Sequence, residues 1–183
     1  MNIKKVELPD ISILKTERNK YDYIDSYQIE FYDKRNNITS TEIGKSFFAN
    51  GPQWIDKLFA FRNRIVVIFG LKTTGGISDR QKCLDKFNCE QGDQFGLFKV
   101  LSKTNSEVIL GENDKHLNFR VSLLQEQIQN RSDTKLLTIS TTVEFNNWFG
   151  RLYFLPVRPF HKLIVPTIMK EMIKNLETEN KVN

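Results

Sequence analysis

The sequence predicts an α+β fold, in which a curved antiparallel sheet grips a long C-terminal helix and two helices follow the first strand. Several segments between residues 95 and 146 alternate apolar with polar residues, as antiparallel strands with one buried face do. The period then changes to that of an amphipathic helix near residue 158. A sheet with one apolar face needs a covering layer, and the helical segments are the apolar faces available for it.

The chain is expected to form one domain over residues 1–183. It has 183 residues, of which 39% are hydrophobic, and this length and composition suit one globular core. Within that domain we expect an N-terminal extension at 1–20, a long polar loop at 72–94 and a frayed tail at 177–183.

Charge and cysteine content exclude several classes of function. The net charge is +5, but acidic residues are interleaved with the basic ones and no nucleic-acid-reading motif is present, so no nucleic-acid partner is expected. The two cysteines and two histidines lack the spacing of a metal site, and no cofactor motif occurs. The start of the chain has no apolar signal region, and no run is long enough to span a bilayer. We therefore expect a cytoplasmic protein with no transmembrane segment, whose oligomeric state the pattern does not indicate.

The first strand and the helices after it follow from periodicity and breakers. Residues 21–32 are rich in β-formers, and a turn composition follows at 33–37. Ser40 or Thr39 is predicted to cap a short helix that runs to about Ala49. The next helix, 52–69, has a wide apolar face with Arg62 near its middle. The predicted dry face of the first strand carries Tyr23, Asp25, Tyr27, Ile29 and Phe31.

Two antiparallel hairpins and a helix complete the predicted order. The first hairpin joins 95–101 to 107–111, and the second joins 116–125 to 135–146. The last helix begins near Arg158, and Pro166 is expected to kink it. Its apolar residues at helical spacing are Phe160, Leu163, Ile164, Ile168, Met172 and Leu176. From these periods we expect deep burial of Trp54, Leu58, Phe119, Val121, Ile139, Val143, Ile164 and Ile168.

The sequence contains the strings Tyr21-Asp-Tyr-Ile-Asp-Ser-Tyr, Gly51-Pro-Gln-Trp with Leu58, Arg62-Asn63, Phe69-Gly-Leu-Lys72, Asp114-Lys-His-Leu-Asn-Phe-Arg120, Gly150-Arg-Leu-Tyr and Pro159-Phe-His161. Together these strings resemble a bacterial family of unknown function, family 2867 among the domains of unknown function, from about residue 8 to 173. The resemblance implies a START-like (SRPBCC) helix-grip fold, whose members hold hydrophobic small molecules or lipids between the sheet and the last helix. That family has no established activity, so no catalytic residue carries over from it.

Charged residues on apolar faces are the candidates for a site. Asp25 lies on the dry face of the first strand and Arg62 on the apolar face of a helix, so we expect them to be buried as a pair. Asp114 and His116 begin a strand; they are a surface turn, or a carboxylate that orients an imidazole at a cavity mouth. The ligand-binding candidates are Asp25, Trp54, Arg62, Asp114, His116, Phe119, Ile139, His161 and Ile164.

Two classes of function stay open at this point. A binding module would hold a hydrophobic small molecule or lipid in an apolar cavity between the sheet and the C-terminal helix. A cyclase- or hydratase-like enzyme would instead use Asp25, Arg62, Asp114 and His116 as the polar set of the same pocket. We favour the binding module, because no aligned nucleophile, acid and base is visible. The walls of the expected cavity are Leu117, Phe119, Leu137, Ile139, Ile164 and Ile168.

Overall fold

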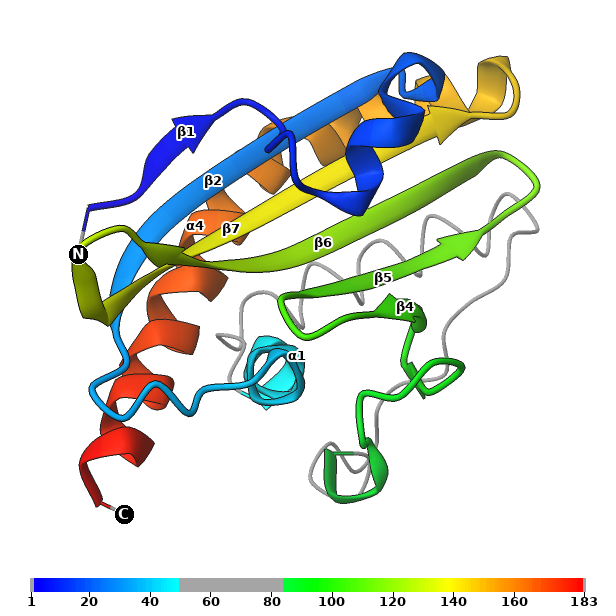
Figure 1. Cartoon of the computed structure of the whole chain (residues 1–183). Coiled ribbons are helices and arrows are strands. Elements are labelled where there is room, and N and C mark those ends of the chain that lie inside the picture. Colours follow the sequence, from blue (N-terminus) through cyan, green and yellow to red (C-terminus); the bar gives the residue numbers. More distant parts are fainter. Residues whose placement is uncertain (1, 50–83, 183) are drawn as a thin grey trace.

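The structure is a computed structural model that describes residues 2–49 and 84–182, with side chains described up to residue 178. Among these residues, seven strands form one antiparallel sheet in the order β1-β2-β7-β6-β5-β4-β3. The helix α4 lies behind this sheet and the 3-10 helix η1 lies in front of it (Figure 1). The elements are β1 (Lys4–Val6), η1 (Ile13–Lys20), β2 (Tyr23–Tyr32), α1 (Ser40–Ala49), β3 (Gln94–Phe95), β4 (Phe98–Lys103), β5 (Glu107–Asn113), β6 (Leu117–Ile128), β7 (Arg131–Phe145) and α4 (Trp148–Val182).

The sheet confirms the predicted fold class, with a curved antiparallel sheet and a long C-terminal helix in a helix-grip arrangement. Both predicted hairpins form: β4 pairs with β5, and β6 pairs with β7 along almost their whole length. The strand predicted at 21–32 forms β2. It pairs with β7 from Tyr23, opposite Val143, to Tyr32, opposite Thr134, and so extends the sheet beyond the two hairpins. One predicted strand was too long: 95–101 is divided into β3 and β4 by a turn in which Gly96 has a φ of 60°.

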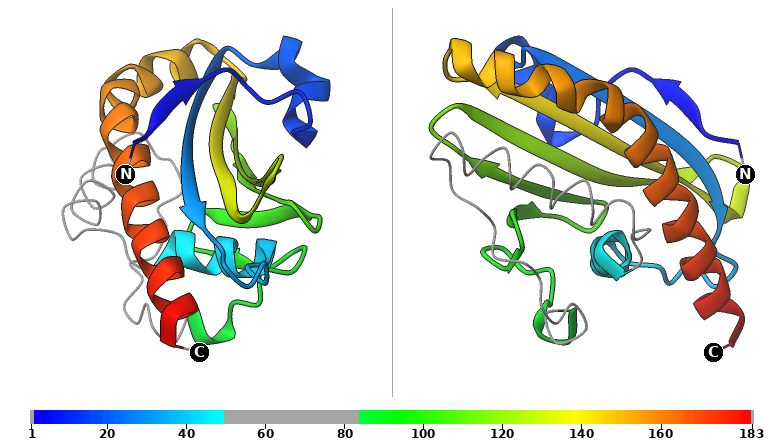
Figure 2. Two further views of the ribbon diagram at one scale, coloured as in Figure 1. Left: turned by 60° about the vertical axis from the view of Figure 1, so that its left-hand side comes forward. Right: turned by 180° about the vertical axis from the view of Figure 1, so that it is seen from behind.

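The concave face of the sheet holds the main core. α4 lies against β2 and β7, whereas α1 lies against β5 and β6 and also contacts α4. Figure 2 shows α4 running diagonally across this face when the molecule is seen from behind. Residues at odd positions of β2 point into this core, as the predicted period requires. Fully buried members include Ile29, Phe31, Ile43, Leu110, Leu123, Leu137, Ile139, Met169, Met172 and Ile173.

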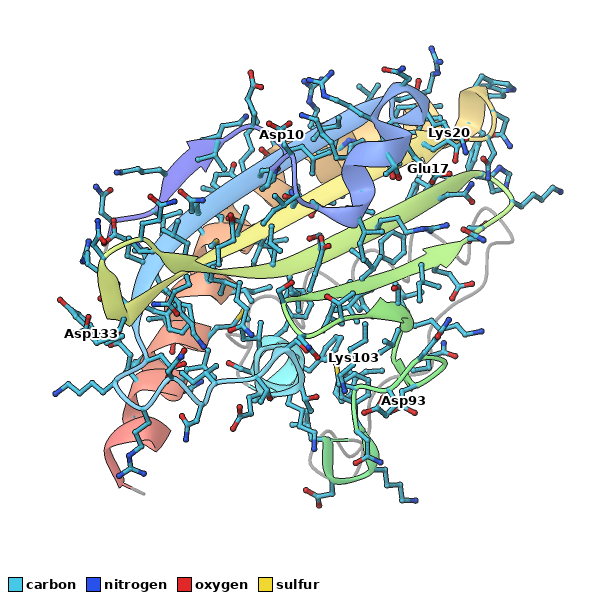
Figure 3. The ribbon with its side chains drawn as sticks, viewed as in Figure 1. Asp10, Glu17, Lys20, Asp93, Lys103 and Asp133 are labelled. Atoms are coloured by element: carbon cyan, nitrogen blue, oxygen red, sulfur yellow. The ribbon has the colours of Figure 1, made fainter. Side chains whose placement is uncertain are left out.

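The predicted N-terminal extension is folded onto the convex face. β1 pairs with β2, and η1 packs over β5 and β6 through the buried side chain of Glu107. The Glu107 carboxylate accepts hydrogen bonds from the hydroxyls of Ser12 (2.6 Å) and Ser122 and from the Ile13 N–H (2.9 Å). Three donors from two segments satisfy a carboxylate that is only 2% exposed. Figure 3 shows Glu17 and Lys20 of η1 on this same side of the sheet.

A buried ion pair fixes the loop between β2 and α1. Lys135 of β7 lies 2.7 Å from Oδ2 of Asp33, and both side chains are buried. The Asp33 carboxylate also accepts hydrogen bonds from the N–H groups of Asn37 and Ile38, and Lys135 donates to the Ile38 carbonyl. The turn predicted at 33–37 is thus held from inside the protein by β7.

The last helix differs from its prediction in start and in phase. α4 begins at Trp148, ten residues before Arg158, and it continues through Pro156, Pro159 and Pro166. It extends to Val182, so the segment expected to form a tail is helical, while its fraying stays a prediction. The side chains of Phe160 and Leu163 are exposed, which contradicts their predicted place on the packing face. The buried side chains of α4 are Phe154, Val165, Met169, Met172, Ile173 and Leu176.

The burial expected for eight core residues is confirmed in part. Val121, Ile139 and Val143 are buried, and Phe119 and Ile168 are only partly buried against the core. Ile164 is also only partly buried, because the packing face of α4 is rotated relative to the prediction. The helix expected at 52–69, with Trp54 and Leu58, and most of the loop expected at 72–94 lie outside the described residues.

Candidate functional site

Asp25 is the centre of the candidate site. It lies on the concave face of β2, opposite Thr141 of β7, and its exposed fraction is 2%. Tyr23 and Tyr27 flank it on the same face and belong to two different apolar clusters of the core. A carboxylate therefore lies between two apolar clusters, where burial without partners would cost several kcal/mol.

Three groups from three elements surround this carboxylate. The Tyr23 hydroxyl donates a hydrogen bond to Oδ2 over 3.0 Å, and Nδ1 of His161 from α4 lies 3.4 Å from the same oxygen. The ammonium of Lys5 from β1 lies 3.3 Å from Oδ1. The side chain of Lys5 is 61% exposed and that of His161 is 16% exposed, so the cluster reaches from the core to the surface.

The electrostatic balance keeps Asp25 ionised. Burial raises the pKa of the Asp25 carboxyl, but hydrogen bonds from His161 and Tyr23 outweigh it and hold the pKa below its ordinary value. Burial, together with the negative charge of Asp25, raises the pKa of Tyr27 to about 12 and that of Tyr23 further. Both phenols therefore stay protonated donors at neutral pH, next to an acceptor that is charged.

This balance determines the tautomer of His161. An ionised carboxylate can only accept hydrogen bonds, so Nδ1 of His161 carries the proton that faces Asp25. In the neutral imidazole, Nε2 then has its lone pair available as a base or as a hydrogen-bond acceptor. No described residue forms a hydrogen bond with Nε2. The arrangement can bind a ligand donor at Nε2 or transfer a proton there.

The apolar surroundings of this cluster come from the first half of α4. The Phe154 ring packs edge-on against Tyr23 with centroids 4.9 Å apart, and the Arg158 guanidinium stacks over Tyr23 at 5.4 Å. Val157 and Phe119 pack against the same small cluster. The Tyr23 ring, whose hydroxyl binds Asp25, is thus in contact with an aromatic side chain and with a cation of α4.

The second histidine lies in a different environment. The Asn147 amide oxygen is 3.2 Å from Nδ1 of His116, and the Phe149 ring packs against the imidazole at 4.8 Å. Asp114, which we considered as the group that orients His116, accepts a hydrogen bond through its backbone carbonyl from Asn146 (2.7 Å). The orienting partner of His116 is therefore the Asn147 amide, and this cluster joins β6 to the first turn of α4.

The remaining candidates divide between the core and the undescribed segment. Ile139 is fully buried in the core, while Phe119 and Ile164 are partly buried. Trp54 and Arg62 lie outside the described residues, and so does the predicted pair of Arg62 with Asp25. The described basic side chains near Asp25 from other elements are those of Lys5 and His161. Sequence reasoning missed Lys5, because a strand of three residues has no readable period, and it left Tyr23 and Tyr27 out of the site although they share the period of Asp25.

The described part of the structure has a surface depression, which is distinct from the cavity predicted between the sheet and the last helix. That depression has a volume of about 220 Å³ and lies near the β1–β2 edge. None of the six expected cavity walls contributes to it, so it is not the predicted cavity. It is lined by Asn2, Lys4, Gln28, Ile29, Glu30 and Leu136.

A comparison with family models assigns the chain. The model of the family described as "Protein of unknown function (DUF2867)" matches residues 18–168, which is most of the chain. The chain belongs to this family. Asp25 and His161 both lie within the DUF2867 match, whereas Lys5 precedes it. No curated protein and no solved structure matches the chain.

Residues 2–49 and 84–182 contain no group of three or more histidine, cysteine or acidic side chains placed to hold a metal ion. In the same part of the chain, no helix combines the length and the apolar character needed to cross a membrane.

Proposed function

We propose that this protein is a binding module for a hydrophobic small molecule or lipid, held between the concave face of the sheet and α4. The polar end of the ligand binds next to Asp25 and His161, and its apolar part packs against the neighbouring aromatic side chains. The proposal includes a START-like (SRPBCC) ancestry, which the antiparallel sheet and the long last helix support. It also includes a bacterial origin and a cytoplasmic location, and the free, buried thiol of Cys89 suits a reducing compartment.

One observation carries the proposal: a carboxylate, an imidazole and two phenols converge inside an apolar interface between β2 and α4. Apolar residues at these positions would pack without the cost of removing polar groups from water. A few convergent polar groups in apolar surroundings are typical of small-molecule sites. Such departures from the simplest core occur where a protein binds or reacts.

The polar set also indicates the kind of ligand group. Nε2 of a neutral His161 accepts a hydrogen bond, so it suits a hydroxyl or another proton-donating head group. The exposed cation of Arg158 next to Tyr23 suits an oxygen that carries negative charge. A long apolar molecule with a hydroxyl or carboxyl end satisfies both requirements.

Native mass spectrometry of the purified protein tests this function, together with titration by a fluorescent fatty acid. Saturable binding that weakens about tenfold in His161→Gln would support it, since one hydrogen bond to the ligand is lost. The matched control is His116→Gln, which changes the other histidine and should bind like the wild type. The absence of any saturable binding by the wild type would overturn the proposal.

A second candidate is a cyclase- or hydratase-like enzyme, and the contact of Asp25 with His161 favours it. A carboxylate that holds Nδ1–H of a histidine leaves Nε2 as a general base. Turnover of an apolar substrate that is lost in His161→Gln, with binding retained, would assign this function instead. Binding without turnover leaves the binding module.

A further inference from the structure

α4 has a second apolar stripe, which faces away from the sheet. Trp148, Leu152, Leu155 and Leu163 are 73%, 53%, 61% and 63% exposed, respectively. With the exposed Pro159, these positions follow one another at intervals of four, three, four and four, so they share one face of the helix. Phe160, which is 45% exposed, lies beside them. We call Trp148, Leu152, Leu155, Phe160 and Leu163 the outer stripe.

The fold does not account for the outer stripe. The buried side chains in the same part of the helix are Phe154 and Val165, on the opposite side. A surface helix normally buries one apolar face and presents polar residues to water. Single exposed apolar residues need no explanation, but a contiguous row of large ones marks an interaction surface.

The charge of this part of α4 indicates its partner. Arg151, Arg158, Lys162 and Lys170 are exposed, and no acidic residue occurs between positions 148 and 170. Asp22 pairs with Arg151 over 3.2 Å. Within the part of the chain that the structure describes, the other three cations have no ion pair. The outer stripe is therefore bordered by positive charge that the protein itself neutralises only in part.

We propose that the first half of α4 binds the surface of an anionic lipid bilayer, with the outer stripe inserted among the head groups. A helix that presents tryptophan, phenylalanine and leucine beside lysine and arginine has the composition of helices that lie in the bilayer interface. Each cation near an anionic membrane surface adds to the attraction, and long basic side chains extend toward the phosphates. This inference goes beyond the proposed ligand-binding function and does not depend on it.

A second copy of the chain fits the same stripe less well. A two-fold contact through α4 would place the cations of one helix against those of the other, which costs free energy. An anionic surface instead gains from each of Lys162 and Lys170, which are exposed. Charge complementarity therefore favours the bilayer over a dimer.

Co-sedimentation with lipid vesicles tests this inference. The wild type should sediment with vesicles of phosphatidylcholine that contain about one third phosphatidylglycerol, and much less with phosphatidylcholine alone. Binding should weaken when the salt is raised to about 0.5 M, because salt screens the attraction. Leu155→Ser combined with Leu163→Ser should lower the partition coefficient at least about tenfold, because two exposed leucines no longer enter the membrane. Lys162→Glu combined with Lys170→Glu should lower it several-fold.

Matched controls separate the outer stripe from exposed apolar or basic residues in general. Ile11→Ser combined with Tyr32→Ser removes two apolar side chains that are 64% and 55% exposed elsewhere. Lys34→Glu combined with Lys86→Glu reverses two exposed charges away from α4. Both control variants should bind vesicles like the wild type, and circular dichroism should show that all variants fold.

Three results would overturn the inference. The first is that the wild type fails to sediment with anionic vesicles. The second is that the controls lose as much binding as the α4 variants. The third is a dimer in light scattering that dissociates in Leu155→Ser with Leu163→Ser, which would assign the outer stripe to a second copy.

Discussion

The imidazole of His161 stands almost perpendicular to the phenol ring of Tyr23, with an interplanar angle of 86° and centroids 6.1 Å apart. Both side chains direct a polar atom at the same oxygen of Asp25, one from α4 and the other from β2. The charge of Asp25 therefore joins the last helix to the sheet as well as forming the candidate site. A change at Asp25 should affect stability in a way that depends on pH.

Asp25→Asn should lower the free energy of unfolding at neutral pH by roughly 1.5–3 kcal/mol, since hydrogen bonds to a charged acceptor are lost. The pKa of Asp25 is lowered by folding, so its contribution is present above the unfolded-state pKa of about 3.9 and is lost as the pH falls through the folded-state pKa. Urea denaturation from pH 7 to pH 2 should show the two proteins converging at acid pH. The control is Glu7→Gln, at an exposed position. A deficit that stays constant with pH would contradict the prediction.

Tyr27 should ionise near pH 12 in the folded protein, because burial and the Asp25 charge raise its pKa to about 12. A pKa raised by folding stabilises the protein below the unfolded-state pKa of about 10, and this contribution is lost as the pH rises through the folded-state pKa. Absorbance titration of tyrosinate should follow the transition, and Tyr27→Phe should remove it. A titration in which all tyrosines ionise near pH 10, before unfolding, would show that the prediction is wrong.

Lys135→Met should lower the free energy of unfolding by about 3–5 kcal/mol, because it removes the ammonium that pairs with the buried Asp33 carboxylate. Combining it with Asp33→Asn should cost less than the sum of the two single changes. The natural control is Arg131→Met, since Arg131 pairs with Glu30 where both side chains are about half exposed. That change should cost less than about 1 kcal/mol. Equal losses at both pairs in thermal denaturation would contradict the prediction.

Glu107→Gln should weaken the attachment of η1 to the convex face of the sheet. The amide group of the new side chain would place N–H donors near donors from Ser12, Ile13 and Ser122, so at least one hydrogen bond is lost. We expect faster hydrogen exchange at the Ile13 amide and a stability loss of roughly 1–3 kcal/mol. Glu112→Gln, on the same strand but partly exposed, should leave exchange at Ile13 unchanged.

Gly150→Ala should destabilise the start of α4. A Cβ atom at this position would lie 2.1 Å from the carbonyl oxygen of His116, and a backbone atom cannot move aside as a flexible side chain can. The cost of such overpacking is roughly 1–3 kcal/mol, measured by urea denaturation. Lys174→Ala, at an exposed position of the same helix, should be neutral within about 0.5 kcal/mol.

The sequence was sufficient for the sheet because its strands repeat a simple pattern. The alternation in β2, β6 and β7 fixed which residues face the core, and it placed Asp25 correctly between Tyr23 and Tyr27. The start of α4 could not be predicted in the same way. Pro156 and Pro159 are normally read as helix breakers, but here they lie on the exposed side of the helix.

The phase of α4, which determines the side of the helix that faces the sheet, could not be predicted from the spacing of apolar residues either. Because apolar residues occur on two sides of this helix, the spacing alone does not decide which side meets the sheet, and the prediction chose Phe160 and Leu163 wrongly. The contact of Lys5 with Asp25 could not be predicted either, for a different reason. Lys5 reaches Asp25 through a strand pairing of only three residues, for which no local sequence signal exists.

The position of β2 between β1 and β7 has a consequence for how the protein is made. During synthesis, β2 has only the three residues of β1 as a partner until β7 has left the ribosome, because Ile29 pairs with Leu137 near the other end of the chain. The hairpins of β4 with β5 and of β6 with β7 are local and can form earlier. Docking of β2 onto that hairpin array must therefore follow the synthesis of β7. Until then the apolar faces of β6 and β7 stay uncovered, and exposed apolar faces of this kind make a nascent chain prone to aggregation.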